Sequence, residues 1–253
     1  MPDFLSRKRF RLALLVLLAT GSAWVQAASS VLIWPINPVI DADTSAAALW
    51  LENRGQDPVR LQVRVLGWSQ VDFEDRLEPQ QQVVGSPPMA TVEPGKRQLV
   101  RLIRRQPAPA GQEQAFRIIV DELLPERTQR TNDLGVQFQM RYSVPLFVYG
   151  AGATVPATAK DARADAGPQL RFRIVQDAGQ HYLYVRNSGA VHARMSEAGL
   201  MQGTRRQDIA QGLLGYVLPA SEMRWPLPPG TSADGVSLLM RVNERQAQTV
   251  EPQ

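Results

Sequence analysis

The chain has 253 residues, of which 44% are apolar and 21% are charged. This composition is too apolar for a disordered protein, and the length suits one large domain or two small ones. Cysteine is absent, which excludes disulfide frameworks, thiolate metal sites and cysteine nucleophiles. The only histidines are His181 and His192, so a histidine metal cluster is excluded and a catalytic triad would need one of these two.

The N-terminus has the features of a secretory signal peptide. Four basic residues precede an apolar run over 12–19, and the small residues Val25 and Ala27 hold the −3 and −1 positions of a cleavage site. The apolar run is too short to cross a bilayer, so we expect no membrane insertion. Removal of residues 1–27 takes away four basic residues and one acid, leaving 24 basic and 23 acidic residues. The remaining net charge gives no electrostatic reason to bind nucleic acid.

Beyond the signal peptide, the apolar residues recur with a period of two. Alternation over six or seven residues predicts a strand with one buried and one exposed face. Short strands separated by Gly- and Pro-containing turns predict an all-β fold built from antiparallel sandwiches. The expected strands are 46–53, 59–65, 98–103, 136–141, 170–175, 181–187, 215–218, 223–227 and 236–242.

The composition changes after Tyr149. Residues 150–168 are rich in Gly, Ala and Pro and contain almost no large apolar side chain, which predicts a linker or loop. We therefore expect an N-terminal domain over 28–149 and a C-terminal domain over 169–253. Each half contains a strand that ends in an asparagine and a small loop, at Asn53 and Asn187, which favours two related sandwiches in tandem.

Three stretches of the first half, taken in order, resemble the periplasmic chaperones of chaperone–usher pilus assembly. The first is a Ser-Pro-Pro segment with a Glu-Pro-Gly turn and a Val-Arg-Leu strand, and the second is similar to that family's F strand. The third lies at the position of its G strand, and its YSVPLFV run is similar to the archaic branch. The stretches are 86–102, 116–125 and 135–148.

The resemblance implies two immunoglobulin-like domains, no enzymatic activity and no cofactor. It also implies a periplasmic location in a Gram-negative bacterium, with pilin subunits and an outer-membrane usher as partners. In this family the chaperone lends its G strand, here about 133–149, to a pilin sandwich that lacks one strand. An exposed edge of this kind risks pairing with itself, so transient self-association or a flexible loop before Gly135 is expected.

The expected subunit-binding residues are Val136, Phe138, Met140 and Tyr142, which share one strand face. Moving such side chains from water into an apolar groove contributes roughly 1.5–3 kcal/mol each. Pro145 lacks an amide donor, and a proline within an apolar run indicates an edge strand. The alternative is that the alternating residues belong to the ordinary core of this domain.

Better-known members of the family hold the subunit's terminal carboxylate with an Arg on the first strand and a Lys on the G strand. Asn37 and Pro145 stand at those positions here. Because a guanidinium can bind a carboxylate through two hydrogen bonds, Arg117 is the first candidate anchor and Arg141 the second. Tyr149 occupies the position of the arginine that forms the family's interdomain ion pair.

Several of these polar residues have structural alternatives. Arg117 could face solvent or pair with a nearby acid such as Asp121 or Glu122. His181 and His192 are expected to be surface or hairpin residues. The acidic residues at 72, 74 and 75 have no calcium-loop spacing and are expected in a solvated loop.

Two other functions are alternatives to a chaperone. A secreted carbohydrate-binding or adhesive module would need an exposed aromatic platform, whereas Trp50, Trp68 and Trp225 are scattered along the sequence. A periplasmic hydrolase is disfavoured by the shortage of histidine and by the lack of a nucleophile elbow. The sequence therefore favours a pilus-subunit chaperone.

Overall fold

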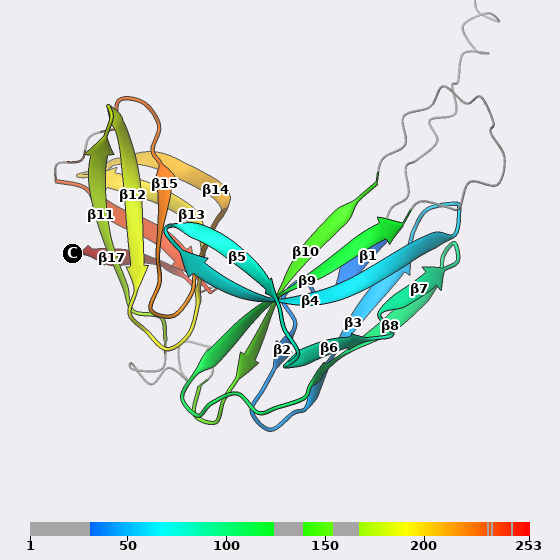
Figure 1. Ribbon diagram of the computed structural model, residues 1–253. Coiled ribbons are helices and arrows are strands. Elements are labelled where there is room, and N and C mark those ends of the chain that lie inside the picture. Colours follow the sequence, from blue (N-terminus) through cyan, green and yellow to red (C-terminus); the bar gives the residue numbers. More distant parts are fainter. Residues whose placement is uncertain (1–30, 124–138, 154–166, 232, 234, 244) are drawn as a thin grey trace, which may run out of the picture.

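The computed structural model describes residues 31–123, 139–153, 167–231, 233, 235–243 and 245–253 (Figure 1). Throughout these ranges every regular element is a β-strand. Nothing in them is a helix of the length and apolarity needed to traverse a membrane. The predicted signal peptide lies outside the described residues.

Ten strands form an N-terminal sandwich of two sheets. One sheet has the order β1-β3-β8-β6, and the other has the order β2-β10-β9-β4-β5, with β7 also paired to β4. Large apolar side chains from both sheets fill the space between them, among them Leu49, Ile118 and Leu146. The strands are β1 Val31–Trp34, β2 Val39–Ile40, β3 Ala46–Asn53, β4 Val59–Val71, β5 Glu74–Pro79, β6 Val83–Ser86, β7 Met89–Val92, β8 Arg97–Arg104, β9 Glu113–Leu123 and β10 Arg141–Tyr149.

Seven further strands form a second, separate sandwich. Their order is β14-β13-β16-β17-β11-β12-β15, and they enclose a core of their own that includes Leu183, Met195 and Leu238. The strands are β11 Leu170–Asp177, β12 Gln180–Asn187, β13 Ala193–Gln202, β14 Arg205–Val217, β15 Glu222–Pro226, β16 Ser237–Val242 and β17 Ala247–Pro252. The prediction of an all-β protein with two immunoglobulin-like domains is confirmed.

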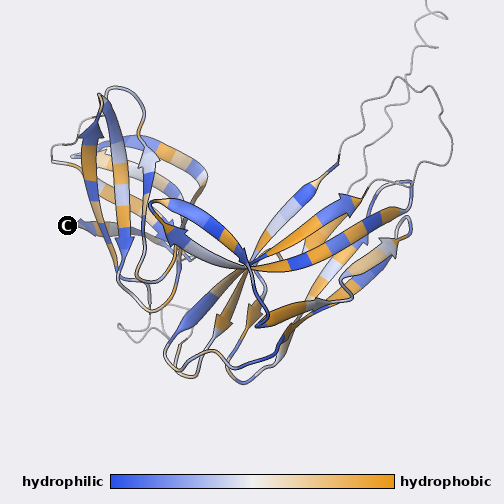
Figure 2. Cartoon of the chain, viewed as in Figure 1, coloured by the Kyte–Doolittle hydropathy of each residue, from blue (hydrophilic) through white to orange (hydrophobic). Residues whose placement is uncertain are grey.

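The alternation of the sequence matches the faces of the strands. In β3, Leu49, Leu51 and Asn53 are buried between the sheets, while Trp50 on the other face is partly exposed. Figure 2 shows the same alternation as bands of opposite hydropathy along the strands. Burial of every second side chain explains why the predicted and observed bounds of β3 agree.

Two X-Pro bonds mark two of the places where the chain passes between the sheets of the first domain. The Trp34–Pro35 bond is cis and joins β1 in one sheet to β2 in the other. The Ser86–Pro87 bond is also cis and joins β6 to β7 in the same way. The Pro-Pro segment is therefore a strand switch.

The loops that follow Asn53 and Asn187 each join two strands that do not pair with each other, and they have equivalent hydrogen bonds. Asn53 is fully buried; its Oδ1 accepts from the N–H of Gly55 and its Nδ2 donates to the carbonyl of Asp57. Asn187 is also fully buried and makes the same bonds two and four residues further along the chain, to Gly189 and Val191. This shared device supports two related sandwiches in tandem.

Candidate functional site

Strand β10 changes its surroundings along its length. From Val144 to Tyr149 every residue is buried, because one face lies in the sandwich core and the other lies against the second domain. At its beginning the strand is covered neither by the core nor by the second domain. Arg141 is exposed, and Met140, just before the strand, has an exposed fraction of 43%. The strand is therefore anchored at one end and uncovered at the other.

Two hydrogen bonds fix which way the main chain of β10 faces. The carbonyl of Met140 accepts from the N–H of Glu122 at 3.0 Å, so the main-chain groups of Met140 face β9. The N–H of Phe147 donates to the carbonyl of Pro38 at 3.4 Å, on the opposite side of the strand. Main-chain groups alternate between the two sides of a strand, and the odd-numbered residues of β10 therefore face away from β9.

This orientation leaves an open edge. β2 pairs with β10 only at Phe147 and Val148. Among the residues that the structure describes, no strand pairs with the outer side of β10 over 141–146. The main-chain donors on this open side are the N–H groups of Arg141 and Ser143. The backbone nitrogen of Pro145, which carries no hydrogen, lies on the same side. Pro145 therefore removes no ladder bond from this sheet, as expected for a proline on an edge strand.

Tyr142 joins three strands at the start of β10. Its side chain packs partly against the sandwich core. The phenol donates to Glu122 Oε1 at 2.9 Å on β9 and contacts the backbone of Val31 on β1. Burial and the neighbouring Glu122 carboxylate raise the pKa of Tyr142 to about 12. Of the other predicted subunit-binding residues, Met140 lies beside this position, while Val136 and Phe138 lie outside the described residues.

Arg117 lies on the face of β9 that points toward the second domain. Its guanidinium carbon is 3.7 Å from the ring centroid of Trp68 and 5.3 Å from that of Tyr216. Its Nη2 is 3.8 Å from Asp75 Oδ2 on β5. Burial lowers the pKa of Arg117, and the carboxylate of Asp75 opposes this shift. The side chain keeps an exposed fraction of 14% and lies opposite Pro145 of β10 in register.

Arg141 and Arg64 both bind Asp121. Arg141 Nε donates to Asp121 Oδ1, and Arg64 Nη2 donates to Oδ2 at 2.7 Å. Burial of the carboxylate acts to raise the pKa of Asp121, but the hydrogen bonds from the two arginines outweigh burial and lower it. The second candidate anchor is therefore already part of an ion-pair cluster across β4, β9 and β10.

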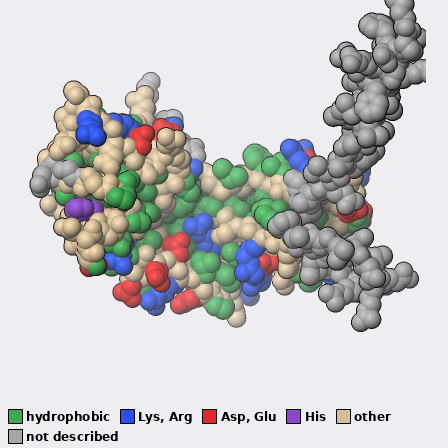
Figure 3. All heavy atoms as spheres, turned by 90° about the horizontal axis from the view of Figure 1, so that it is seen from above, with side chains coloured by type: hydrophobic (Ala, Val, Ile, Leu, Met, Phe, Trp, Pro, Cys, Tyr) green, Lys and Arg blue, Asp and Glu red, His purple; other side chains and the backbone are tan. Residues whose placement is uncertain are grey.

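The second domain packs on the outer face of β10 through aromatic rings. The His192 ring is stacked on Phe147, with centroids 3.5 Å apart and planes 5° apart. Tyr216 lies edge-on to Trp68 at 5.4 Å. In the view of Figure 3, hydrophobic side chains are prominent in the middle of the molecule, with charged side chains beside them.

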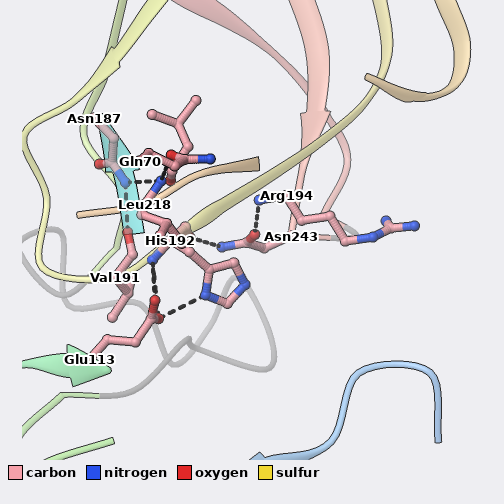
Figure 4. Close-up of polar contacts among 9 residues, drawn as sticks. Gln70, Glu113, Asn187, Val191, His192, Arg194, Leu218 and Asn243 are labelled. Atoms are coloured by element: carbon pink, nitrogen blue, oxygen red, sulfur yellow. Dashed lines mark hydrogen bonds and ion pairs between the residues drawn. The ribbon is translucent and has the colours of Figure 1, made fainter. Parts of the chain in front are cut away.

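A buried polar contact also joins the domains (Figure 4). His192 Nδ1 lies 2.7 Å from Glu113 Oε2, and the N–H of His192 donates to the same carboxylate at 3.1 Å. Burial and the Glu113 carboxylate raise the pKa of Tyr149, which stands at the expected arginine position. His192 was expected at the surface or in a hairpin; instead it is buried, with its ring enclosed between the two domains.

Gln70 forms a second polar link between the domains. Its Nε2 donates to the carbonyl of Tyr216 at 3.0 Å, and its Oε1 accepts from the N–H of Leu218 at 2.8 Å. Asn37 lines a cavity of about 120 Å³ that has residues of both domains in its walls. The cavity lining is Asn37, Val39, Phe147, Tyr149, His192, Arg194, Tyr216 and Asn243.

The tryptophans and acidic residues that bear on the alternative functions have structural roles in this fold. Trp68 is buried at the domain interface, and Trp225 packs against the second core, so they form no common platform with Trp50. The described ranges contain no cluster of three His, Asp or Glu side chains suited to a metal ion. Of the acidic group expected in a loop, Glu74 and Asp75 instead belong to β5, and Asp75 faces Arg117.

Sequence reasoning missed Glu113, His192, Gln70 and Tyr216 as interface residues. Glu113, Gln70 and Tyr216 lie on strands, and His192 lies just before β13. The alternation of a strand does not identify a partner in the other domain. A usable signal was the pair Phe147 and Tyr149, which extends the apolar character of β10 to its second face. A strand that is apolar on both faces is covered on both sides.

Comparison with known proteins agrees with this geometry. Residues 35–153 match the family model described as pili and flagellar-assembly chaperone, PapD N-terminal domain. No curated protein sequence matches the chain. A chaperone–tip adhesion subunit pre-assembly complex, CsuC–CsuE from archaic chaperone–usher Csu pili of Acinetobacter baumannii, contains a chain that is 31% identical. That match covers 88% of this chain and 99% of the other, with a TM-score of 0.73.

More distant structures share the fold. The E. coli chaperone DraB is 20% identical, with 89% of this chain and 98% of that chain covered and a TM-score of 0.58. A Salmonella enterica complex of the SafA pilin with the SafB chaperone is 17% identical, with 88% and 94% covered and a TM-score of 0.59. The family model, the 31% identity over nearly the whole chain and the two-domain fold lead to one conclusion: this chain belongs to the family of pilus-assembly chaperones, in its archaic branch.

Proposed function

We propose that this protein is a periplasmic chaperone that binds pilin subunits by donor-strand complementation and delivers them to an outer-membrane usher. The predicted signal peptide over 1–27 supports export to the periplasm. The CsuC–CsuE and SafA–SafB structures are complexes of chaperones with subunits, which supports a pilin or tip subunit as the partner. The chaperone membership of these relatives also fits a non-enzymatic role.

The observation that carries the proposal is the open edge of β10. Arg141 and Ser143 present main-chain groups on a side that no described strand occupies. On the even-numbered face, exposure rises from fully buried at Leu146 to 7% at Val144 and 43% at Met140. A subunit strand added at this edge would gain main-chain bonds and cover the apolar face that the sandwich leaves uncovered.

The sequence before β10 continues the same face. Val136 and Phe138 have the parity of Met140 and Tyr142, so an extended chain would direct all four to one side. Transfer of these apolar side chains into a subunit groove would contribute roughly 1.5–3 kcal/mol each. Their spacing gives the donated strand a register, because a shift of one residue would turn every one of them away from the groove.

We assign the subunit's terminal carboxylate to Arg117 rather than Arg141. Arg141 already shares Asp121 with Arg64, whereas the single acid near Arg117 in the described chain lies at 3.8 Å, longer than a normal hydrogen bond. The indole Nε1 of the neighbouring Trp68 is buried with no hydrogen-bond partner among the described residues, and it is a second candidate donor.

The donor strand is tested by Phe138→Asp, measured as capture of a co-expressed pilin from the same bacterium. We expect capture to be lost while the melting temperature of the chaperone stays nearly unchanged, because Phe138 is assigned to the subunit and not to the core. Gln137→Asp adds the same charge at the neighbouring position and should retain capture. A large fall in the melting temperature of Phe138→Asp would place Phe138 in the chaperone's own core and contradict the proposal.

Delivery to the usher is tested by exchange from the purified chaperone–pilin complex. Subunit release should accelerate when vesicles containing the usher of the same system are added, and should not accelerate with empty vesicles. Equal release rates in both samples would contradict delivery to the usher without affecting the subunit-binding assignment.

A further inference from the structure

The hairpin formed by β4 and β5 projects from the first domain toward the second (Figure 1). Every residue of β5 is exposed, so this hairpin has no core of its own. Phe73 in the turn is nevertheless partly buried. The apolar cover of its ring therefore comes from the other domain.

The turn that carries Phe73 has an unfavourable backbone for its sequence. Val71 pairs with Glu74, which leaves a two-residue loop of Asp72 and Phe73 with φ angles of 55° and 66°. Loops with positive φ at both positions prefer Asn-Gly or Asp-Gly, and a bulky aromatic residue in this region is an outlier. Glycine at position 73 would suit the hairpin better, which points to a role for the ring outside the hairpin.

The ring of Phe73 meets a stack of aromatic and arginine side chains on the second domain. It lies edge-on to Tyr184 of β12, with centroids 5.2 Å apart and planes at 89°. The guanidinium carbon of Arg224 on β15 is 5.0 Å from the centroid of Phe73, and Arg224 also donates to the Tyr184 hydroxyl at 3.3 Å. Arg173 covers the Tyr184 ring at 4.2 Å. These contacts are directional and hold the tip against one place on the sheet.

The hairpin is attached to the second domain at three levels. Trp68 at its base contacts Tyr216, and Gln70 in its middle binds the backbone of β14. Phe73 at its tip reaches Tyr184, on a different strand. Contacts to several strands along one hairpin resist rotation between the domains better than a contact at one level.

We infer that the β4–β5 hairpin is an interdomain strut and that Phe73 is a positioning residue, whose contact with Tyr184 and Arg224 fixes the angle between the two domains beside the open edge of β10. The inference rests on the proposed function for its effect on subunit capture. The strut itself is a property of the free protein. When the angle is no longer fixed, only part of the population has the binding geometry, and the apparent affinity falls by that fraction.

Phe73→Gly separates the effect of residue 73 on the turn from the contact of its ring with the second domain. The substitution creates the preferred Asp-Gly turn and removes the ring. The absence of cysteine allows spin labels to be placed in the purified protein at Lys96→Cys on the first domain and Gln248→Cys on the second. We expect Phe73→Gly to broaden the distribution of distances between the labels while the melting temperature of the first domain is unchanged or higher. Affinity for the pilin should fall about 3- to 10-fold.

Two further variants make the test specific. Phe73→Tyr keeps the ring and should restore the narrow distribution. Arg224→Ala removes one of the two contacts of the ring and should broaden the distribution less than Phe73→Gly does. The double variant should be no broader than Phe73→Gly alone, because Arg224 acts on the domain angle through this ring. An unchanged distribution in Phe73→Gly would overturn the strut. A wild-type protein that binds no pilin would contradict the proposed function instead, and the label distances in the free protein would still decide the strut.

Discussion

The two halves of β10 have opposite surroundings although they belong to one continuous strand. Val144–Tyr149 is buried on both faces, between the core of its own sandwich and the second domain. Arg141–Ser143 pair with β9 on one side, with one more main-chain hydrogen bond at Met140, and have an open edge on the other side. The buried half fixes the position and register of the whole strand, including its open half.

This difference explains how an exposed strand can stay ordered. An isolated edge segment would lose much conformational freedom on binding, whereas a segment held by a buried continuation has lost it already. The ion-pair cluster at Asp121 and the phenol of Tyr142 extend this support to the open half.

The largest effect is expected in the buried half. Leu146 is fully buried, so Leu146→Ala should lower the free energy of unfolding by about 2–5 kcal/mol through lost burial and a residual cavity. Urea unfolding measures this change. Ser143→Ala, in the open half of the same strand, should change it by less than about 0.5 kcal/mol. Similar values for the two variants would show that the halves do not differ.

The assignment of the carboxylate to Arg117 can be isolated with a double-mutant cycle. A peptide with the sequence of the pilin C-terminus is prepared with a free carboxylate and with an amide. A charge-assisted hydrogen bond contributes about 1.5–3 kcal/mol, so amidation should weaken binding to the wild type by about 10-fold or more. Amidation should have little effect on Arg117→Met. An equal effect of amidation on both proteins would remove Arg117 from the carboxylate site.

A smaller effect is expected from Tyr142→Phe, which removes the hydroxyl that joins β10 to Glu122. The loss of this hydrogen bond should reduce the free energy of unfolding by about 0.5–1.5 kcal/mol. Subunit affinity should change little, because the ring remains. A stability equal to that of the wild type would show that the hydroxyl does not support the open half.

The smallest effect is expected from Asp121→Asn, and it depends on pH. The pKa of Asp121 is lowered in the folded protein, so its carboxylate stabilises the fold above the unfolded pKa of about 3.9 and loses this effect as the pH falls through the folded value. Both arginines are partly exposed, and the advantage of the wild type at neutral pH should be below about 1 kcal/mol. Urea unfolding at several pH values measures it. An advantage that persists at the most acidic pH would contradict this role for Asp121.

The sequence predicted the parts of the fold that depend on local pattern. The alternation at 46–53 matches β3 to the residue, and the loops after Asn53 and Asn187 have the same hydrogen bonds. Pro145 on an edge strand was also predictable, because a missing N–H excludes it from a central position. These features depend on neighbours in sequence or on one strand face.

Contacts between the domains could not be predicted in this way. Arg117 was predicted as a carboxylate anchor, with solvent or an acid close in sequence as the alternatives, and its contact with the ring of Tyr216 in the second domain was not predicted. His192 pairs with Glu113, which is far away in the chain. Such partners depend on the relative placement of two sandwiches, which strand periodicity does not encode. Likewise, an Asp-Phe loop with two positive φ angles contradicts local preference.

The central claim is that a subunit strand pairs with the open edge of β10, and amide hydrogen exchange tests it residue by residue. The N–H groups of Arg141 and Ser143 should exchange rapidly in the free chaperone and slowly in its complex with a pilin. Tyr142 and Val144 face β9 and should be protected in both states, which makes them internal controls. If Arg141 and Ser143 exchange equally fast in both states while the pilin is bound, the subunit does not pair with β10 and the account is wrong.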